Sequence, residues 1–152
     1  MRKENALSKI TVTVQIDAPA EKVWETIADF GGISNWAPNV LSSYSTTPNN
    51  GGVDAARHCE VAGFGGVDER IIDWEDGSGY TFIVENIGPV RRVFSTWAVS
   101  AQDDRATVTT SLDISMKFGL FGAAIYQLVA RRNFLKAIAV GQSGLKQYVE
   151  SN

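Results

Sequence analysis

Hydrophobic and polar residues alternate between positions 10 and 16, in the stretch ITVTVQI. This period of two predicts a β-strand with one buried face. A turn at 17–19 follows, and Pro19 stands where a helix can begin without losing a needed N–H group. The apolar residues of 20–30 then recur at helical spacing. The chain therefore opens with a strand and a short amphipathic helix.

The segment 29–38, DFGGISNWAP, predicts a helix end followed by a bend. Gly31 and Gly32 end the helix because glycine tolerates left-handed backbone geometry. One further helical turn fits at 33–36, before Pro38 forces the preceding residue into an extended conformation. We expect this stretch to bend around the mouth of an internal cavity, with Trp36 at the rim. The alternative is that Trp36 simply packs beneath the short helices.

Six runs of strand-forming residues fill positions 40–117, separated by turns rich in Gly, Asn and Asp. Hairpins without intervening helices predict an antiparallel meander. After Lys117 the pattern becomes helical, and no proline follows Pro89, so we expect one long helix from about residue 120 to residue 150. The order of strand, two short helices, six strands and long helix predicts a single α+β domain spanning 1–152.

The expected C-terminal helix has small residues on the side that should face the sheet. This stripe comprises Tyr126, Ala130, Asn133, Ala137, Gly141 and Leu145. Gly141 and Gly144 each cost about 1 kcal/mol relative to alanine inside a helix, so both need a reason. They either make room for a ligand or let the helix pack closely on the sheet, and both interpretations stay open at this point.

Four polar residues share strand faces with apolar neighbours. They are Arg57, Glu69, Ser95 and Thr110. Such groups are costly in a dry core unless they are paired, and an apolar pocket with a few placed polar groups is typical of a small-molecule site. Arg57 and Glu69 either face a ligand or form a salt bridge, because sequence does not settle strand register.

Composition excludes several functional classes. The 152 residues are 44% hydrophobic with a net charge of −3, so we expect no nucleic-acid partner. One cysteine and one histidine leave no disulfide and no multi-histidine zinc site, and we expect no metal and no cofactor. The N-terminal segment 1–12 lacks the apolar run of a secretory signal, and no apolar stretch reaches the ~20 residues of a membrane span. We expect a cytoplasmic monomer or homodimer.

Catalysis has weaker support than binding in this sequence. His58 should point away from the cavity if its neighbour Arg57 points inward, so it gives Cys59 no base. Cys59 is then best read as a small buried hydrophobe. Phe118, Leu120 and Phe121 form an apolar lip that either touches a membrane transiently during ligand exchange or packs at the sheet edge.

Three stretches resemble the START-like or SRPBCC superfamily, and more closely its bacterial polyketide cyclase/dehydrase-like branch. They are ITVTVQIDAPAEKVWETIADFGGISNWAPNV, ARHCEVAGFGGVDERIIDWEDGSGYTFIVENIGPVRRVFSTWAVS and the terminal GLKQYVE. The resemblance implies the helix-grip fold of the major birch pollen allergen and the plant abscisic acid receptors. In that fold a seven-stranded antiparallel sheet curls around a long C-terminal helix, with two short helices between strands 1 and 2. It also implies a hydrophobic cavity between sheet and helix.

Carried over residue by residue, the resemblance implies a set of cavity-lining positions. They are Trp36, Arg57, Cys59, Glu69, Tyr80, Phe82, Val93, Ser95, Trp97, Thr110, Asn133, Ala137 and Gly141. Glu69 matches an acidic residue that faces the ligand in the plant receptors, whereas Val93 departs from a common aromatic and weakens an aromatase-type assignment. We expect binding of a lipid, polyketide, isoprenoid or aromatic molecule. The alternative is a metal-free cyclase or dehydratase-type lyase with Glu69 and Arg57 as its polar catalytic groups.

Overall fold

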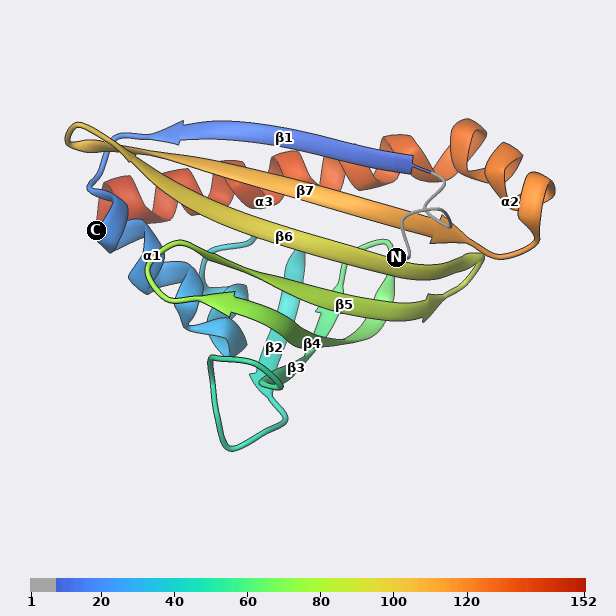
Figure 1. The fold of residues 1–152 in the computed structure, drawn as a ribbon, viewed down its shortest axis with the longest axis horizontal. Helices are drawn as coiled ribbons and strands as arrows, with labels where there is room; N and C mark the ends of the chain where they lie inside the picture. The colour runs from blue at the N-terminus through green and yellow to red at the C-terminus, as the bar shows by residue number, and fades with distance from the viewer. Residues whose placement is uncertain (1–7) are drawn as a thin grey trace.

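A curved antiparallel sheet wraps around a long C-terminal helix (Figure 1). The computed structural model describes residues 8–152, so the segment expected to lack a secretory signal lies partly outside the described residues. Seven strands and the helical segments follow the order that the sequence predicts. They are β1 (Ser8–Ile16), α1 (Ala20–Ala28), the 3₁₀-helix η2 (Phe30–Asn35), β2 (Val40–Ser45), β3 (Ala56–Val61), β4 (Gly65–Glu75), β5 (Gly79–Ile87), β6 (Val90–Gln102), β7 (Arg105–Met116), α2 (Gly119–Ile125), the π-helical turn η3 (Tyr126–Ala130) and α3 (Arg131–Ser151).

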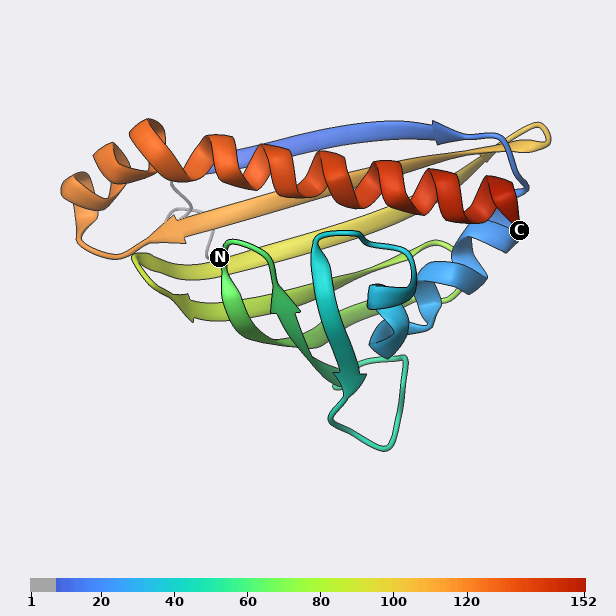
Figure 2. The same cartoon turned by 180° about the vertical axis from the view of Figure 1, so that it is seen from behind.

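The strand order in the sheet is β1-β7-β6-β5-β4-β3-β2, with every neighbouring pair antiparallel. Strands β2 to β7 are therefore a continuous meander, as the turn spacing predicts. β1 joins the far edge beside β7, so the connection from β1 to β2 has to travel from one edge of the sheet to the other. α1 and η2 make this crossing at one end of the molecule (Figure 2).

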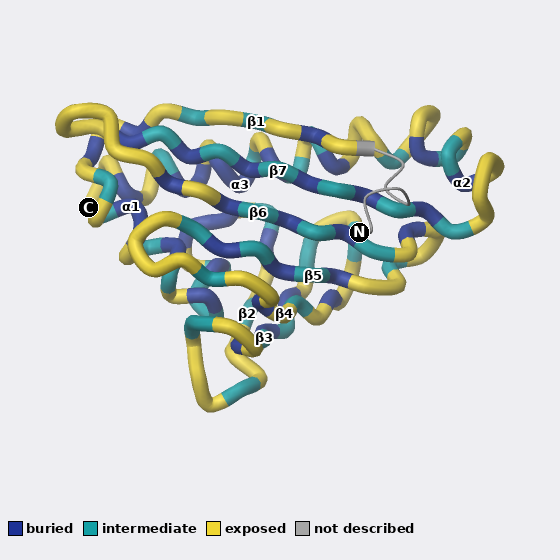
Figure 3. The backbone as a smooth tube through the Cα atoms, in the orientation of Figure 1, coloured by how far each residue is buried: buried dark blue, intermediate teal, exposed yellow. Residues whose placement is uncertain are grey.

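Burial alternates along the strands, because successive side chains point to opposite faces (Figure 3). On β7 the residues Val108, Thr110, Leu112 and Ile114 are buried. The concave face of the sheet carries these residues toward α3. Gln142 of α3 is also buried, and its Nε2 donates hydrogen bonds to the Val12 carbonyl at 2.9 Å and to Thr110 Oγ1 at 3.0 Å. A buried amide thus ties the helix to β1 and β7.

The C-terminal helix contains one π-helical turn, which the sequence pattern did not predict. A π turn inserts an extra residue and rotates everything after it relative to a regular helix. Tyr126 is buried as expected, but the buried side of α3 then runs through Phe134 and Ile138, and Asn133 is exposed. The predicted and observed stripes therefore differ at position 133, where the next residue, Phe134, is buried instead, and they agree at Gly141 and Leu145.

Candidate functional site

A cavity of about 150 Å³ lies between the concave face of the sheet and α3. It is lined by residues of η2, of β2 to β7 and of α3, and by the segments between η2 and β2 and between β3 and β4. Ten of the residues implied by the family resemblance lie on its walls: Trp36, Arg57, Glu69, Phe82, Val93, Ser95, Trp97, Thr110, Ala137 and Gly141. Whether they contact a ligand stays a prediction.

The other three residues of that set do not line this cavity. Tyr80 is buried beneath α1, where its hydroxyl donates to the Ile27 carbonyl at 3.1 Å and its ring stacks on Trp74. The Cys59 thiol lies 3.9 Å from Glu69 Oε1, and burial raises the pKa of this thiol to about 12. Asn133, after the π turn, is exposed and lines a neighbouring cavity instead.

Twelve further residues line the cavity beyond those implied by the resemblance. They are Ile33, Ala37, Asn39, Val40, Val61, Phe64, Val67, Val84, Ile87, Leu112, Phe134 and Ile138. Strand alternation could have found several of them, since Val61 and Leu112 share faces with Arg57 and Thr110. Asn39 and Phe64 lie in irregular segments and give no periodic signal.

A second cavity of about 290 Å³ adjoins the first. The two share Asn39, Phe64 and Ala137. The outer cavity is completed by the turn at 62–64 and by Asn133, Lys136 and Val140 of α3. Between the two, the Phe64 ring packs on that of Phe134 with 5.5 Å between centroids, and Asn39 Nδ2 donates to the Ala137 carbonyl at 3.4 Å. We call the outer cavity the mouth.

Arg57 and Glu69 pair with each other at the wall of the inner cavity. They are direct partners across β3 and β4, and both Arg57 Nε and Nη2 contact Glu69 Oε1. Arg57 is 2% exposed, its Nη1 donates to the Phe30 carbonyl at 2.7 Å, and its guanidinium lies 3.8 Å from the centre of the Phe30 ring. Burial alone would lower the pKa of Arg57, but the charge of Glu69 and its hydrogen bond, together with the nearby Tyr80 and Cys59, outweigh burial and raise the pKa. The cavity is thus bordered by a neutralised pair.

Two polar atoms on cavity-lining residues are buried without a hydrogen-bond partner among the described residues. They are the indole Nε1 of Trp36 and the side-chain oxygen of Asn39. The Trp36 ring meets the Trp97 ring edge to face, with 5.6 Å between centroids. An unpaired buried N–H costs free energy, so Trp36 offers a donor whose partner a ligand can supply.

The two helix glycines have different roles. A Cβ on Gly144 would overlap the Trp36 carbonyl and the Pro38 ring, so this glycine allows close packing. Outside its own stretch of helix, a Cβ on Gly141 would meet only Trp97 Cη2 within 4 Å among residues 8–152, at 3.9 Å, and Gly141 lines the cavity. The sequence left two interpretations open, close packing and room for a ligand. Close packing describes Gly144, and open space beside the cavity describes Gly141.

His58 lies on the opposite face of β3 from Arg57. Its Nδ1 is 2.8 Å from Asp68 Oδ1 and its Nε2 is 2.8 Å from Glu60 Oε2. Hydrogen bonds to these carboxylates raise the pKa of His58. The imidazole therefore serves a surface ion cluster and does not reach the cavity.

Sequence comparison identifies the family. Residues 8–150 match the sequence profile described as polyketide cyclase / dehydrase and lipid transport. The chain belongs to the polyketide cyclase/dehydrase and lipid-transport family. No curated protein matches it by sequence.

Two kinds of feature are absent from residues 8–152. No three His, Cys, Asp or Glu side chains there are grouped so that they could hold a metal ion. None of the helices there is both apolar enough and long enough to cross a bilayer.

Solved structures share the helix-grip fold of this polyketide cyclase-like chain. The protein Ara h 8.0201 is 15% identical, with a TM-score of 0.75 over 95% of this chain and 99% of its own. The Streptomyces aromatase/cyclase ZhuI is 16% identical, with a TM-score of 0.76 over 94% and 93%. A START superfamily protein from Mycobacterium smegmatis is 15% identical, with a TM-score of 0.72 over 94% and 97%. At this identity the likeness shows the fold alone.

Proposed function

We propose that this protein binds an uncharged hydrophobic small molecule in the cavity between the sheet and α3. The observation that carries the proposal is an apolar cavity whose only charged lining residues, within the described chain, are already paired with each other. A charged ligand group would have to be desolvated there with no free counter-charge beside it. Membership of a cyclase and lipid-transport family agrees with a hydrophobic ligand in general.

The size of the cavity limits what the inner part can hold. A site of about 150 Å³ accommodates a molecule the size of benzene. The inner cavity and the mouth together fall within the range of about 300–1,000 Å³ that small-molecule sites occupy. We therefore infer that one ring-sized apolar group enters the inner cavity and that the rest of the ligand lies in the mouth, past Phe64.

Trp36 adds a chemical requirement. Its N–H needs an acceptor, so the group beside it in the inner cavity carries a carbonyl or ether oxygen. A matched pair of probes, indane and 1-indanone, differs by one carbonyl oxygen. We expect 1-indanone to bind more tightly by about tenfold, the effect of one hydrogen bond that satisfies a buried donor. The Trp36→Phe variant should lose this preference and keep indane binding.

The first measurement is native mass spectrometry of the purified protein, followed by denaturing extraction of any bound molecule. A stoichiometric hydrophobic molecule supports the proposal and supplies a compound to test for turnover. A protein that purifies empty and binds neither indane nor 1-indanone contradicts it. Equal affinity for the two probes would contradict the role of Trp36 and leave the cavity as a binding site.

A cyclase or dehydratase is the second candidate, because Arg57 and Glu69 lie together at the cavity wall. Proton transfer by Glu69 would require its carboxylate to leave Arg57, which also bonds the Phe30 carbonyl. This pairing favours binding over catalysis. Glu69→Gln preserves the shape and removes the acid, so loss of turnover of the extracted compound would support the enzyme, and unchanged turnover would exclude Glu69 as the proton-transfer group.

Three further expectations stay predictions. They are a cytoplasmic location, a monomer or homodimer, and transient membrane contact through Phe118, Leu120 and Phe121.

A further inference from the structure

Five large apolar side chains are exposed at one end of the molecule, in the segment that joins β7 to α3. Their exposed fractions run from 58% to 91%, and they are Phe118, Leu120, Phe121, Leu128 and Val129. We call this set the apolar tip. Figure 1 shows α2 projecting beyond the ends of β6 and β7. Single exposed apolar residues are ordinary, but five within twelve positions form a patch typical of an interaction surface.

The backbone holds the apolar tip outward. Phe118 and Gly119 both have left-handed geometry, with φ of 69° and 55°, and turn the chain away from the sheet. Gly122 then packs so closely on the Lys117 carbonyl that a Cβ there would overlap it, and Tyr126 is buried. Because α2 is anchored through its small inner residue, its large side chains are left on the outer side.

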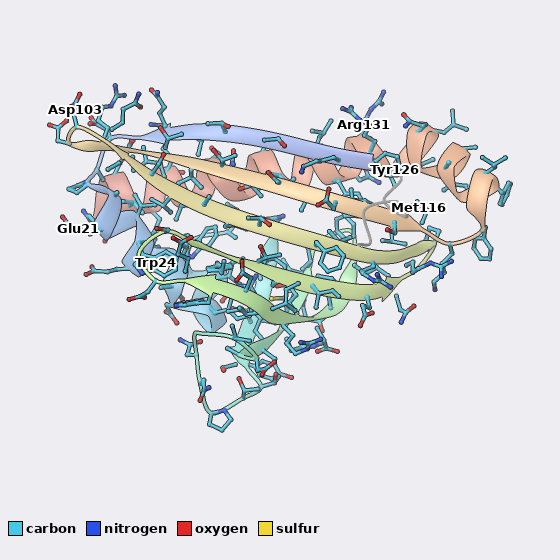
Figure 4. All side chains as sticks on the ribbon, viewed as in Figure 1. Glu21, Trp24, Asp103, Met116, Tyr126 and Arg131 are labelled. Carbon is cyan, nitrogen blue, oxygen red and sulfur yellow. The ribbon has the colours of Figure 1, made fainter. Side chains whose placement is uncertain are left out.

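The charge around the apolar tip is uniformly positive in sequence. No Asp or Glu occurs between positions 114 and 149, although the whole chain has a net charge of −3. Lys117, Arg131 and Arg132 flank the tip, and Arg91 follows Val90, the partner of Met116. Among residues 8–152 none of these four cations forms an ion pair. Figure 4 places Met116, Tyr126 and Arg131 at this end of the molecule, and Glu21 and Asp103 at the other.

We propose that the apolar tip docks on the surface of a bilayer that contains anionic lipids. Apolar side chains that enter the headgroup region together with flanking Lys and Arg residues are the combination by which peripheral proteins bind such surfaces. A second copy of the chain fits less well. A two-fold contact through the tip would bring two sets of unpaired cations together, and like charges across an interface are unfavourable.

Docking would also bring the mouth of the cavity to the membrane. Val129 lies one helical turn before Asn133, which lines the mouth with Lys136. At 1.5 Å of rise per residue, Val129 and Lys136 are separated by about 10 Å along the helix. A hydrophobic ligand could then pass between bilayer and cavity with a short path through water. This surface goes beyond the ligand-binding proposal and does not depend on it.

Co-sedimentation with vesicles tests the docking proposal. We expect the protein to pellet with vesicles of phosphatidylcholine and phosphatidylglycerol at low salt, less at high salt, and little with phosphatidylcholine alone. Leu120→Asp places a charge at the most exposed position of the tip, 91% exposed, and should weaken binding at least about tenfold. Arg131→Gln should weaken it about fivefold, the effect of one cation near an anionic surface.

Leu41→Asp is the matched control, because Leu41 is an exposed leucine on β2, away from the tip. It should pellet like the unaltered protein. All three variants should keep the same thermal unfolding transition and the same affinity for 1-indanone in solution, which separates docking from ligand binding.

Failure of the unaltered protein to bind the anionic vesicles would overturn the proposal, and so would equal binding by Leu120→Asp. A dimer that Leu120→Asp dissociates, without any vesicle binding, would show that a second copy covers the tip.

Discussion

α1 and α3 cover the same sheet in opposite ways. Under α1 the space is filled by rings, since Trp24 meets Trp74 edge to face at 5.0 Å and Tyr80 meets Phe30 in the same way at 5.5 Å. Under α3 the small residues Ala137 and Gly141 stand beside Phe134 and Ile138, and a cavity remains. The fold therefore does not determine whether a helix covers a core or a cavity. The sizes of a few side chains determine it, and this protein keeps its solid packing and its open volume in separate regions.

The boundary between the filled and open regions is the Arg57–Glu69 pair, which packs on Phe30 from one side and borders the cavity on the other. Arg57→Met should have the largest effect, a loss of about 3 kcal/mol in the free energy of unfolding. Removal of one partner from a buried pair costs about 3–5 kcal/mol, and Glu69, at 12% exposure, keeps some contact with water. Urea denaturation measures the loss. Arg70→Met, at an exposed pair with Asp54, is the control and should change stability by less than about 0.5 kcal/mol.

Gly144 and Gly141 test the contrast between close packing and open volume within α3 itself. Gly144→Ala should destabilise the protein by about 1–2 kcal/mol, because the overlap with the Trp36 carbonyl and Pro38 outweighs the gain in helix propensity. Gly141→Ala should stabilise it by about 0.5–1 kcal/mol, since the new Cβ would lie in ordinary contact with Trp97 Cη2 at 3.9 Å. Thermal and urea unfolding of the two variants give the comparison. Equal destabilisation by both would mean that the helix is close-packed along its whole length.

Filling the cavity should remove binding and leave the fold intact. Gly141→Leu places a branched side chain beside Trp97, where the helix faces the open volume. We expect affinity for 1-indanone to fall at least about tenfold, the free-energy equivalent of about 1.4 kcal/mol. Isothermal titration measures the affinity, and a retained cooperative unfolding transition shows that the variant folds. Unchanged affinity would place the probe outside this cavity.

The smallest effect concerns the outer face of β3. The pKa of His58 is raised by hydrogen bonds to Asp68 and Glu60, so the folded state holds the proton more tightly than the unfolded chain. This stabilisation is fully present below the unfolded pKa of about 6.5 and is lost as the pH rises through the higher folded value. We expect a slight fall in thermal stability as the pH rises above about 6.5, and His58→Gln should abolish it. Affinity for 1-indanone should not follow this change, because His58 faces away from the cavity.

Strand period was enough to predict the inward faces of the sheet. Ser95 and Thr110 are buried where alternation with their apolar neighbours places them, and His58 points outward because Arg57 points inward. A helical stripe has to be extrapolated over many turns, and Asn133 lines the second cavity rather than the first. The π turn ahead of α3 rotates that stripe, and nothing in the sequence around Tyr126 marks where such a turn forms.

The sequence by itself determined the strand and helix order, the small residues of α3 and the positions of the inward polar groups, because these follow from local periodicity and residue size. Tertiary structure alone decided how the polar groups are satisfied. The register of β3 against β4 places Arg57 opposite Glu69 and neutralises both, and within residues 8–152 the Trp36 N–H has no hydrogen-bond partner. The tertiary structure also decided that Gly144 packs closely while Gly141 faces open space. Pairing depends on which distant segments meet, and that information lies in the packed chain and not in the spacing of its residues.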